Sequence, residues 1–148
     1  LREFQGVEHR IELCNEIDGI RFVNDSKGTN PDAAIRAIEA MKRDIILIAG
    51  GYDKGASFDE FVNAFDGKVK ALVLLGKTAT KIKEAAEKAG FTNTVILKDM
   101  EACVREAYRL AESGDVVLLS PACASWDMYT SFEQRGEHFK ACVRELER

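Results

Sequence analysis

Short, nearly uninterrupted apolar runs alternate with amphipathic segments along most of this chain. The runs at residues 45–49, 69–75 and 116–119 are typical of strands that are covered on both faces. Two further strands are expected at residues 20–23 and 94–97, and apolar residues at helical spacing predict helices at residues 32–41, 58–65, 78–89, 100–112 and 131–146. Strands that alternate with helices build a parallel sheet with helices on both faces. The pattern therefore predicts an α/β fold around a mostly parallel sheet of about six strands.

The N-terminal part departs from this alternation. Residues 7–17 alternate apolar and polar side chains, and Asp18-Gly19 separates them from the strand-like run at residues 20–23. An Asp-Gly pair between two such runs is a strong signal for a hairpin. We therefore expect an antiparallel N-terminal hairpin beside the parallel strands.

Local signals mark where two of the helices begin. Asn30 is expected to be the N-cap of the helix at residues 32–41, with Pro31 in its first position. Ser57 is expected to cap the next helix, at residues 58–65.

Composition excludes several classes of protein. The 148 residues suit one domain, and 46% apolar with 31% charged residues is ordinary for a globular protein. A net charge of −4 argues against nucleic-acid or membrane-surface binding. The four cysteines form no Cys-x-x-Cys pair, and no apolar run has membrane length, so we expect a reduced, cytoplasmic protein without a zinc site. Because Leu1 is not a methionine, the chain is expected to be a piece of a longer protein.

The segment at residues 24–31, Asn-Asp-Ser-Lys-Gly-Thr-Asn-Pro, lies where a predicted strand ends and a helix begins. Open α/β folds bind ligands at this position, and the helix start offers free N–H donors to an anion. Helix capping accounts for Asn30 and Pro31. It does not account for Asp25, Lys27 and Thr29, which we therefore take as candidate site residues.

Polar residues follow other predicted strands as well, and the carboxyl ends of parallel strands share one edge of a sheet. Lys54 lies in the glycine-rich residues 50–55, and residues 120–127 carry hydroxyls and Trp126. Lysines and hydroxyls gathered on one edge suit an acidic ligand, either a carboxylate or a phosphate.

Several residues at or near this edge have a second interpretation. Gly76-Lys77-Thr78 resembles the end of a phosphate-binding P-loop, but strand residues stand where that loop needs its glycine and flexible backbone, so Lys77 is expected to be an ordinary strand-end residue. Cys123 is expected to pack rather than to act as a nucleophile, and His138 to lie on a solvated helix face. His9 and Trp126 stay open between packing and ligand contact.

Five motifs together resemble the C-terminal domain of the Mur ligase family, in its D-glutamate-adding branch. They are Glu8-His9-Arg10, the turn at residues 24–30, and residues 50–55, 119–127 and 132–136. The resemblance covers essentially the whole chain. Other Mur ligases and folylpolyglutamate synthase tend to carry Asp-x-Ala-His-x-Pro at the first turn, whereas residues 26–30 here read Ser-Lys-Gly-Thr-Asn.

The resemblance implies a three-layer, Rossmann-like domain of an ATP-dependent ligase. Such ligases phosphorylate a substrate carboxylate with ATP and Mg²⁺, and an incoming amine attacks the acyl phosphate to form an amide. Here D-glutamate would be added to UDP-N-acetylmuramoyl-L-alanine during peptidoglycan synthesis. The implied D-glutamate-binding residues are Lys27, Thr29, Lys54, Ser125, Trp126 and Phe132. The implied nucleotide-binding residues are His9 near the base, Arg10 toward phosphate and Asp25 toward ribose.

The resemblance also implies that much of the active site lies outside this chain. The P-loop, the Mg²⁺ ligands and the UDP-sugar site belong to the central and N-terminal domains, so residues 1–148 are expected to form a single domain without a metal ligand or a certain catalytic residue. We expect the domain to fold, to be inactive alone, and to move about a hinge at residues 1–6 in the complete enzyme. The alternatives are a sibling Mur-type or folylpolyglutamate-type ligase, or a stand-alone binding module for acidic metabolites.

Overall fold

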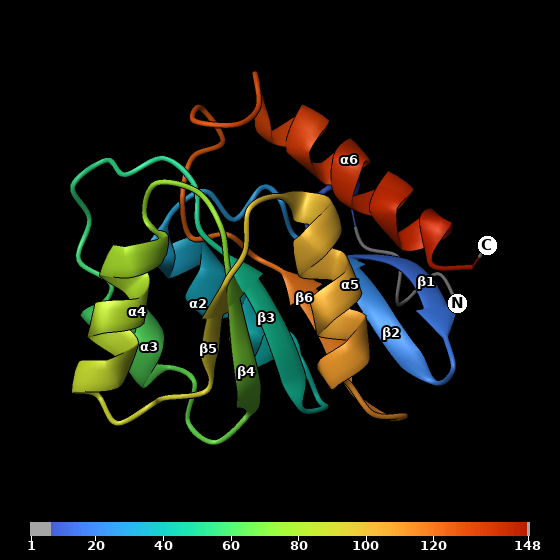
Figure 1. Ribbon diagram of the computed structural model, residues 1–148, viewed down its shortest axis with the longest axis horizontal. Helices are drawn as coiled ribbons and strands as arrows, with labels where there is room; N and C mark the ends of the chain where they lie inside the picture. The colour runs from blue at the N-terminus through green and yellow to red at the C-terminus, as the bar shows by residue number, and fades with distance from the viewer. Residues whose placement is uncertain (1–6, 148) are drawn as a thin grey trace.

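A six-stranded sheet forms the centre of the computed structural model, which describes residues 7–147 (Figure 1). The strand order is β1-β2-β6-β3-β4-β5, and only the β1–β2 pair is antiparallel. The strands span β1 Glu12–Ile17, β2 Ile20–Asn24, β3 Ile45–Ala49, β4 Val69–Leu74, β5 Thr94–Ile96 and β6 Val116–Leu119. The predicted α/β class and the mostly parallel sheet of six strands are confirmed.

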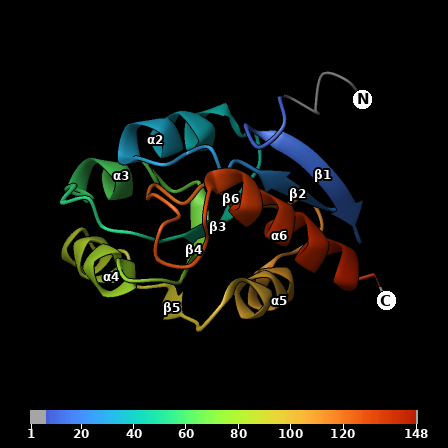
Figure 2. The same cartoon turned by 90° about the horizontal axis from the view of Figure 1, so that it is seen from above.

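Helices cover both faces of the sheet, which gives three layers (Figure 2). Helices α2, α3 and α4 pack with one set of strand side chains, and α5 and α6 pack with the opposite set. The helices span α2 Pro31–Ala40, α3 Asp59–Asn63, α4 Ala79–Lys88, α5 Met100–Leu110 and α6 Phe132–Glu145. The predicted three-layer arrangement is confirmed.

The central strand β3 explains why the apolar runs lack alternation. All five of its residues are buried, because β6 and β4 pair with it on either side and helices lie above and below. Successive side chains point to opposite faces, so Leu47 joins the core under α2, α3 and α4, and Ile46 and Ile48 join the core under α5 and α6.

The N-terminal hairpin forms, but it is shorter than expected. Asp18 and Gly19 have φ values of 55° and 79°, as a tight two-residue hairpin turn of type I′ requires. The expectation of an extended run from residue 7 is wrong, since β1 begins at Glu12. His9 and Ile11 have φ values of 64° and 49°, which turn the chain away from an extended path. The hinge expected at residues 1–6 lies outside the described residues.

Helix α2 begins as predicted. The side chain of Asn30 accepts a hydrogen bond of 2.9 Å from the backbone N–H of Ala33, and Pro31 occupies the first turn. At its other end, the ammonium group of Lys68 donates to the carbonyl of Met41 at 2.6 Å and to that of Ile38 at 3.2 Å. Phe58 occupies the N-cap position of α3, one residue after the predicted Ser57, and makes no side-chain capping bond. The hydroxyl of Ser57 nevertheless accepts a hydrogen bond of 3.3 Å from the N–H of Asp59, so Ser57 does bond to the first residue of the helix.

The connections at the carboxyl ends of the strands leave the sheet in two directions. Strand β6 lies between β2 and β3 in the sheet. After β2 and β3, the chain continues into α2 and α3 on one face of the sheet. After β6, it continues into α6 on the opposite face. The connecting loops gather along the upper edge in Figure 1. Such a divergence opens a crevice at the strand ends, where ligands of open α/β sheets bind.

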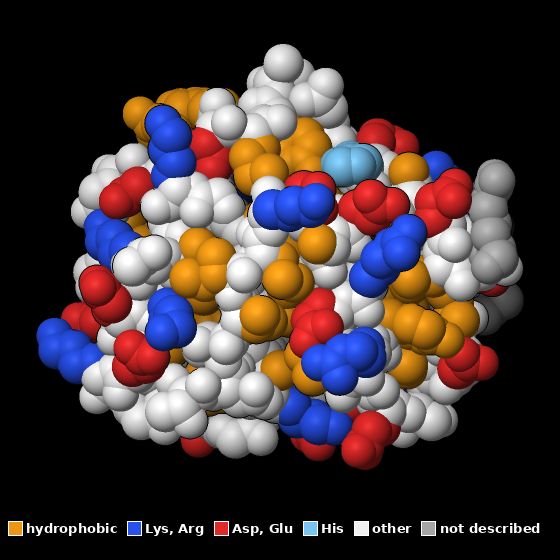
Figure 3. Space-filling model, viewed as in Figure 1, with side chains coloured by type: hydrophobic (Ala, Val, Ile, Leu, Met, Phe, Trp, Pro, Cys, Tyr) orange, Lys and Arg blue, Asp and Glu red, His pale blue; other side chains and the backbone are white. Residues whose placement is uncertain are grey.

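Charged side chains of both signs are interspersed on the face drawn in Figure 3. Among residues 7–147, no helix combines the length and apolar character that crossing a membrane would need.

Replacement of Asn30 by Ala should lower the free energy of unfolding by about 1 kcal/mol, because the N–H of Ala33 loses its acceptor at the helix start. Asn30→Asp should retain most of the stability, since a carboxylate caps equally well. Urea unfolding measures both. Glu39→Ala, at an exposed position of the same helix, is the control, and an equal loss in that variant would show that the cap contributes nothing specific.

Candidate functional site

The turn between β2 and α2 is fixed by buried hydrogen bonds around Asp25. Its backbone N–H donates to Leu119 of β6 at 2.7 Å. One carboxylate oxygen accepts from the N–H of Ile11 at 3.1 Å, and the other accepts from the hydroxyl of Ser120 at 2.7 Å. Burial raises the pKa of the Asp25 carboxyl above its ordinary value, while these two hydrogen bonds act in the opposite direction. The carboxylate thus joins three segments of the chain.

Gly28 is required by the tightness of this turn. A Cβ atom at this position would lie 2.7 Å from a carboxylate oxygen of Asp25 and 2.7 Å from the hydroxyl of Ser120. Both distances are shorter than any ordinary contact, so a larger residue would push the two groups apart.

A buried arginine connects the turn to the loop after β6. Arg135 is 3% exposed, and its guanidinium donates to the hydroxyl of Ser26 at 2.9 Å, to the carbonyl of Ser26 at 2.7 Å and to the carbonyl of Cys123 at 2.9 Å. Burial lowers the pKa of Arg135 to about 10, which leaves the group protonated at neutral pH. No role for Arg135 was predicted from the sequence. What could have indicated one is its position in α6, since this charged residue lies on the helix face that carries the buried residues Phe139 and Val143.

A small pocket lies in the crevice and brings together two predicted site residues, Thr29 and Lys54. It has a volume of about 120 Å³. Three loops line it, those after β2, β3 and β6, with residues Thr29, Asn30, Pro31, Tyr52, Lys54, Ala56, Phe58, Ala122, Cys123 and Ala124. Thr29, Asn30, Tyr52 and Lys54 bring polar side chains to a pocket whose lining is mostly apolar.

Each candidate lysine lies over an aromatic ring. The Nζ atom of Lys54 is 5.1 Å from the ring centroid of Trp126, and the Nζ atom of Lys27 is 5.9 Å from that of Phe132. The Trp126 ring also contacts Tyr52, with 5.4 Å between centroids, and remains 63% exposed. These rings favour particular positions of two exposed ammonium groups through cation–π attraction.

Cys123 and Ser125 lie in the loop after β6 and are both buried. The Sγ atom of Cys123 is 3.2 Å from the hydroxyl of Thr78, and burial raises the pKa of its thiol to about 11. A thiol with that pKa is protonated at neutral pH, so the prediction of a packed residue rather than a nucleophile agrees with the structure. The expected contact of Ser125 with a ligand stays a prediction.

The two candidates at the N-terminal turn differ in exposure. Arg10 is exposed, whereas His9 is 4% exposed and its ring forms a T-shaped pair with that of Phe132, with 6.1 Å between centroids. The expected place of His9 beside a nucleotide base stays a prediction, as does the contact of Arg10 with phosphate. His138 is exposed, as expected, with one ring nitrogen 2.7 Å from the hydroxyl of Tyr129.

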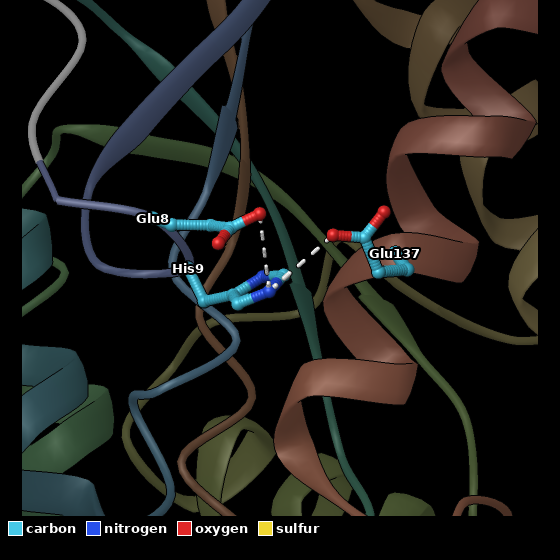
Figure 4. A group of neighbouring side chains, drawn as sticks. All are labelled: Glu8, His9 and Glu137. Carbon is cyan, nitrogen blue, oxygen red and sulfur yellow. Dashed lines mark ion pairs between the residues drawn. The ribbon is translucent and has the colours of Figure 1, made fainter.

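One group of side chains has the composition of a metal site. Potential ligand atoms of Glu8, His9 and Glu137 lie within 4.8 Å of one another (Figure 4). The ammonium group of Lys140, however, lies 3.3 Å from Glu8, 3.3 Å from Glu137 and 3.2 Å from Glu12. A lysine already supplies the positive charge that these carboxylates need, so we assign no metal to them.

Gly76-Lys77-Thr78 does not build a phosphate cradle. The hydroxyl of Thr78 is buried and accepts a hydrogen bond from the N–H of Gly51 at 3.0 Å, and the N–H of Lys77 donates to Asp127 at 3.0 Å. These groups hold the loops after β3, β4 and β6 together, so they are not free to surround a phosphate. The rejection of a P-loop here agrees with the structure.

Comparison with known proteins identifies close relatives. The family "Mur ligase, glutamate ligase domain" matches residues 9–123. The UDP-N-acetylmuramoylalanine–D-glutamate ligase of Caldanaerobacter subterraneus subsp. tengcongensis is 59% identical over 150 residues, which cover 100% of this chain and 33% of that protein. The protein of the same name from Clostridioides difficile is 56% identical over 146 residues, covering 99% of this chain and 32% of that protein. The chain thus spans about a third of the length of these relatives.

Solved structures share the fold at low sequence identity. The UDP-N-acetylmuramate–alanine ligase of Thermotoga maritima has a TM-score of 0.68 at 15% identity, over 99% of this chain and 32% of that chain. The bifunctional folylpolyglutamate synthase/dihydrofolate synthase of Yersinia pestis, complexed with AMPPNP and a Mn ion, has a TM-score of 0.63 at 16% identity, over 97% of this chain and 32% of that chain. The family match over residues 9–123, which is more than three quarters of the chain, establishes that this chain belongs to the Mur ligase family through its glutamate ligase domain.

Proposed function

We propose that this chain is the amino-acid-binding domain of an ATP-dependent ligase that joins D-glutamate to UDP-N-acetylmuramoyl-L-alanine. The relatives at 59% and 56% identity are named for D-glutamate ligation, and the first-turn sequence Ser26-Lys27-Gly28-Thr29-Asn30 favours the same branch of the family. The other parts of the enzyme would lie in the two thirds of the relatives that this chain does not span.

The observation that carries the proposal is the pocket shared by Thr29 and Lys54 at the crevice. Its volume of about 120 Å³ is below the ~300 Å³ of typical sites for larger ligands, so it suits a group of few atoms such as a carboxylate-bearing side chain. An ammonium group supplies charge to such a carboxylate, and a hydroxyl supplies a directed hydrogen bond. Ser125 would add a further hydroxyl from the loop after β6.

D-Glutamate carries two carboxylates, and the domain offers two lysines on neighbouring loops. Lys54 lies over Trp126 and Lys27 lies over Phe132, so each ammonium group is held near an aromatic side chain of the segment that follows β6. We assign one carboxylate to Lys54 with Thr29 and the other to Lys27. This assignment gives Trp126 and Phe132 the task of placing the charges.

Binding both carboxylates would leave the amine as the free end of the amino acid, directed out of the crevice. The amine attacks the carbonyl carbon of an acyl phosphate, an amide bond forms, and inorganic phosphate leaves. The contribution of this domain is orientation, because a correctly placed amine reacts as if its concentration were very high. The two lysines also reduce repulsion between the anionic amino acid and the acyl phosphate.

On the nucleotide side, we propose that Arg10 contacts a phosphate of ATP and that Asp25 lies near the ribose. Arg10 is exposed at the rim of the domain, which supports its availability to a ligand held by another part of the enzyme. Mg²⁺ would neutralise phosphate charge during transfer to the substrate carboxylate. Its ligands are assigned to the rest of the protein, since the one carboxylate–histidine group within residues 7–147 surrounds Lys140.

In the full-length enzyme, Lys54→Ala should raise the KM for D-glutamate about 10- to 100-fold, which corresponds to losing one charged hydrogen bond of roughly 1.5–3 kcal/mol. The KM for ATP should stay unchanged. Steady-state rates of phosphate release measure both values. Lys77→Ala, an exposed lysine at the end of β4 outside the pocket, is the matched control and should leave both constants unchanged. An unaltered KM for D-glutamate in Lys54→Ala would remove Lys54 from the site.

The amino-acid specificity distinguishes the proposed ligase from its alternatives. The full-length enzyme should form an amide with D-glutamate and not with L-glutamate or L-lysine, as followed by chromatography of the product. Amide formation with one of the other amino acids instead would indicate a sibling ligase.

The 148-residue chain alone should unfold cooperatively but show no turnover, and measurable turnover by that chain would contradict the proposed division of the active site.

A further inference from the structure

The turn that carries Arg10 holds a strained backbone. The N–H of Arg10 donates to the carbonyl of Val7 at 2.9 Å, which closes the turn. Arg10 is flanked by His9 at a φ of 64° and Ile11 at a φ of 49°, a conformation that L side chains rarely adopt. Each such residue costs about 1–3 kcal/mol, so surrounding contacts must hold the turn in place.

Backbone hydrogen bonds anchor both residues that flank Arg10. The carbonyl of His9 accepts from the N–H of Lys27 at 2.9 Å. The N–H of Ile11 donates to the carboxylate of Asp25 at 3.1 Å. The turn is therefore attached on both sides to the segment between β2 and α2, and the position of Arg10 depends on that attachment.

The His9 ring adds a third anchor, and its hydrogen bonds determine which nitrogen carries the proton. The amide oxygen of Asn24 must face the N–H of Ser26, 3.0 Å away, and the amide nitrogen must face the carboxylate of Glu12, 3.1 Å away. That nitrogen also lies 2.9 Å from Nδ1 of His9. An amide N–H can only donate, so Nδ1 is an acceptor and the ring proton is on Nε2.

The opposite side of the ring faces helix α6. Nε2 lies 3.5 Å from a carboxylate oxygen of Glu137 and 3.8 Å from one of Glu8. Dashed lines in Figure 4 mark the two pairs. Gly136 lets the helix approach this closely, since a Cβ atom there would overlap Nδ1 of the ring. The ring is thus enclosed between β2 and α6.

We propose that His9 is a positioning residue for Arg10, which it holds in place by fixing the strained turn between Asn24 and α6. The inference rests on the proposed function in one respect, namely that Arg10 contacts a phosphate of ATP. In this proposal His9 does not contact the base of the nucleotide. Its buried ring affects nucleotide binding only through the position of Arg10.

Two substitutions of His9 in the full-length enzyme test this role. His9→Leu removes the acceptor for Asn24 and places a residue with a poor preference for positive φ in the turn, so the KM for ATP should rise about 10-fold while the KM for D-glutamate stays unchanged. His9→Asn keeps a side-chain acceptor and tolerates positive φ, so its KM for ATP should stay within about threefold of the unmodified enzyme. His138→Leu replaces the other histidine of the chain and is the control.

A double-mutant cycle with Arg10→Ala separates positioning from direct contact. Arg10→Ala should raise the KM for ATP, and adding His9→Leu to it should change that value by no more than about twofold, because a residue that acts through Arg10 has nothing left to position. Multiplied effects would overturn the proposal and indicate that His9 contacts the nucleotide itself. An unchanged KM for ATP in His9→Leu alone would also overturn it, as would an Asn variant as impaired as the Leu variant.

The same cycle distinguishes failure of the inference from failure of the proposed function. If Arg10→Ala itself leaves the KM for ATP unchanged, the nucleotide contact of Arg10 is wrong, and the role of His9 is wrong with it. If Arg10→Ala raises the KM for ATP and His9→Leu does not, only the positioning role is wrong.

Thermal unfolding of each variant is recorded first, to show that it folds. If His9→Leu does not fold, His9→Gln replaces it in the cycle.

Discussion

The guanidinium group of Arg135 is the interaction on which the geometry of the strand-end crevice depends. It projects from α6 into the domain and donates to two atoms of Ser26 and to the carbonyl of Cys123. It acts together with other bonds between the same segments: the hydroxyl of Ser26 donates to the carbonyl of Phe132 at 2.7 Å, and the N–H of Ala122 donates to the carbonyl of Gly28 at 2.8 Å. A buried cation is costly to desolvate, and three oxygen acceptors offset that cost. Within residues 7–147, Arg135 forms no ion pair with a carboxylate, and its acceptors are hydroxyl and carbonyl oxygens.

Around this buried centre, the domain combines fixed turns with exposed charges. Asp25, Gly28 and Ser120 pack so tightly that the backbone between β2 and α2 has little freedom. Lys27 and Lys54, in contrast, extend over aromatic rings at the surface. A fixed backbone with exposed ammonium groups fits the proposed amino-acid site, which the rest of the enzyme would complete.

The predictions from the sequence succeeded where a local signal had one physical meaning. The five apolar residues of β3, the Asp18-Gly19 turn and the cap at Asn30 each matched the structure, because burial, positive φ and N–H capping are properties of short segments. They failed at residues 7–11, where an alternating pattern suggested a strand. Hydrogen bonds to Asp25 and Lys27, distant in sequence, hold that segment as a strained turn instead.

The fold class and the set of polar residues that follow the strands could be predicted from the sequence, because periodicity and turn chemistry are local and parallel strands place their carboxyl ends on one edge. Its motifs also indicated the family. Which of those residues meet became apparent from the three-dimensional structure. Thr29 and Lys54 share a pocket, Lys140 lies among the carboxylates beside His9, and Arg135 is internal, because each of these contacts joins segments that are far apart in the sequence. Such contacts depend on strand order and helix placement, which side-chain patterns along the chain do not encode.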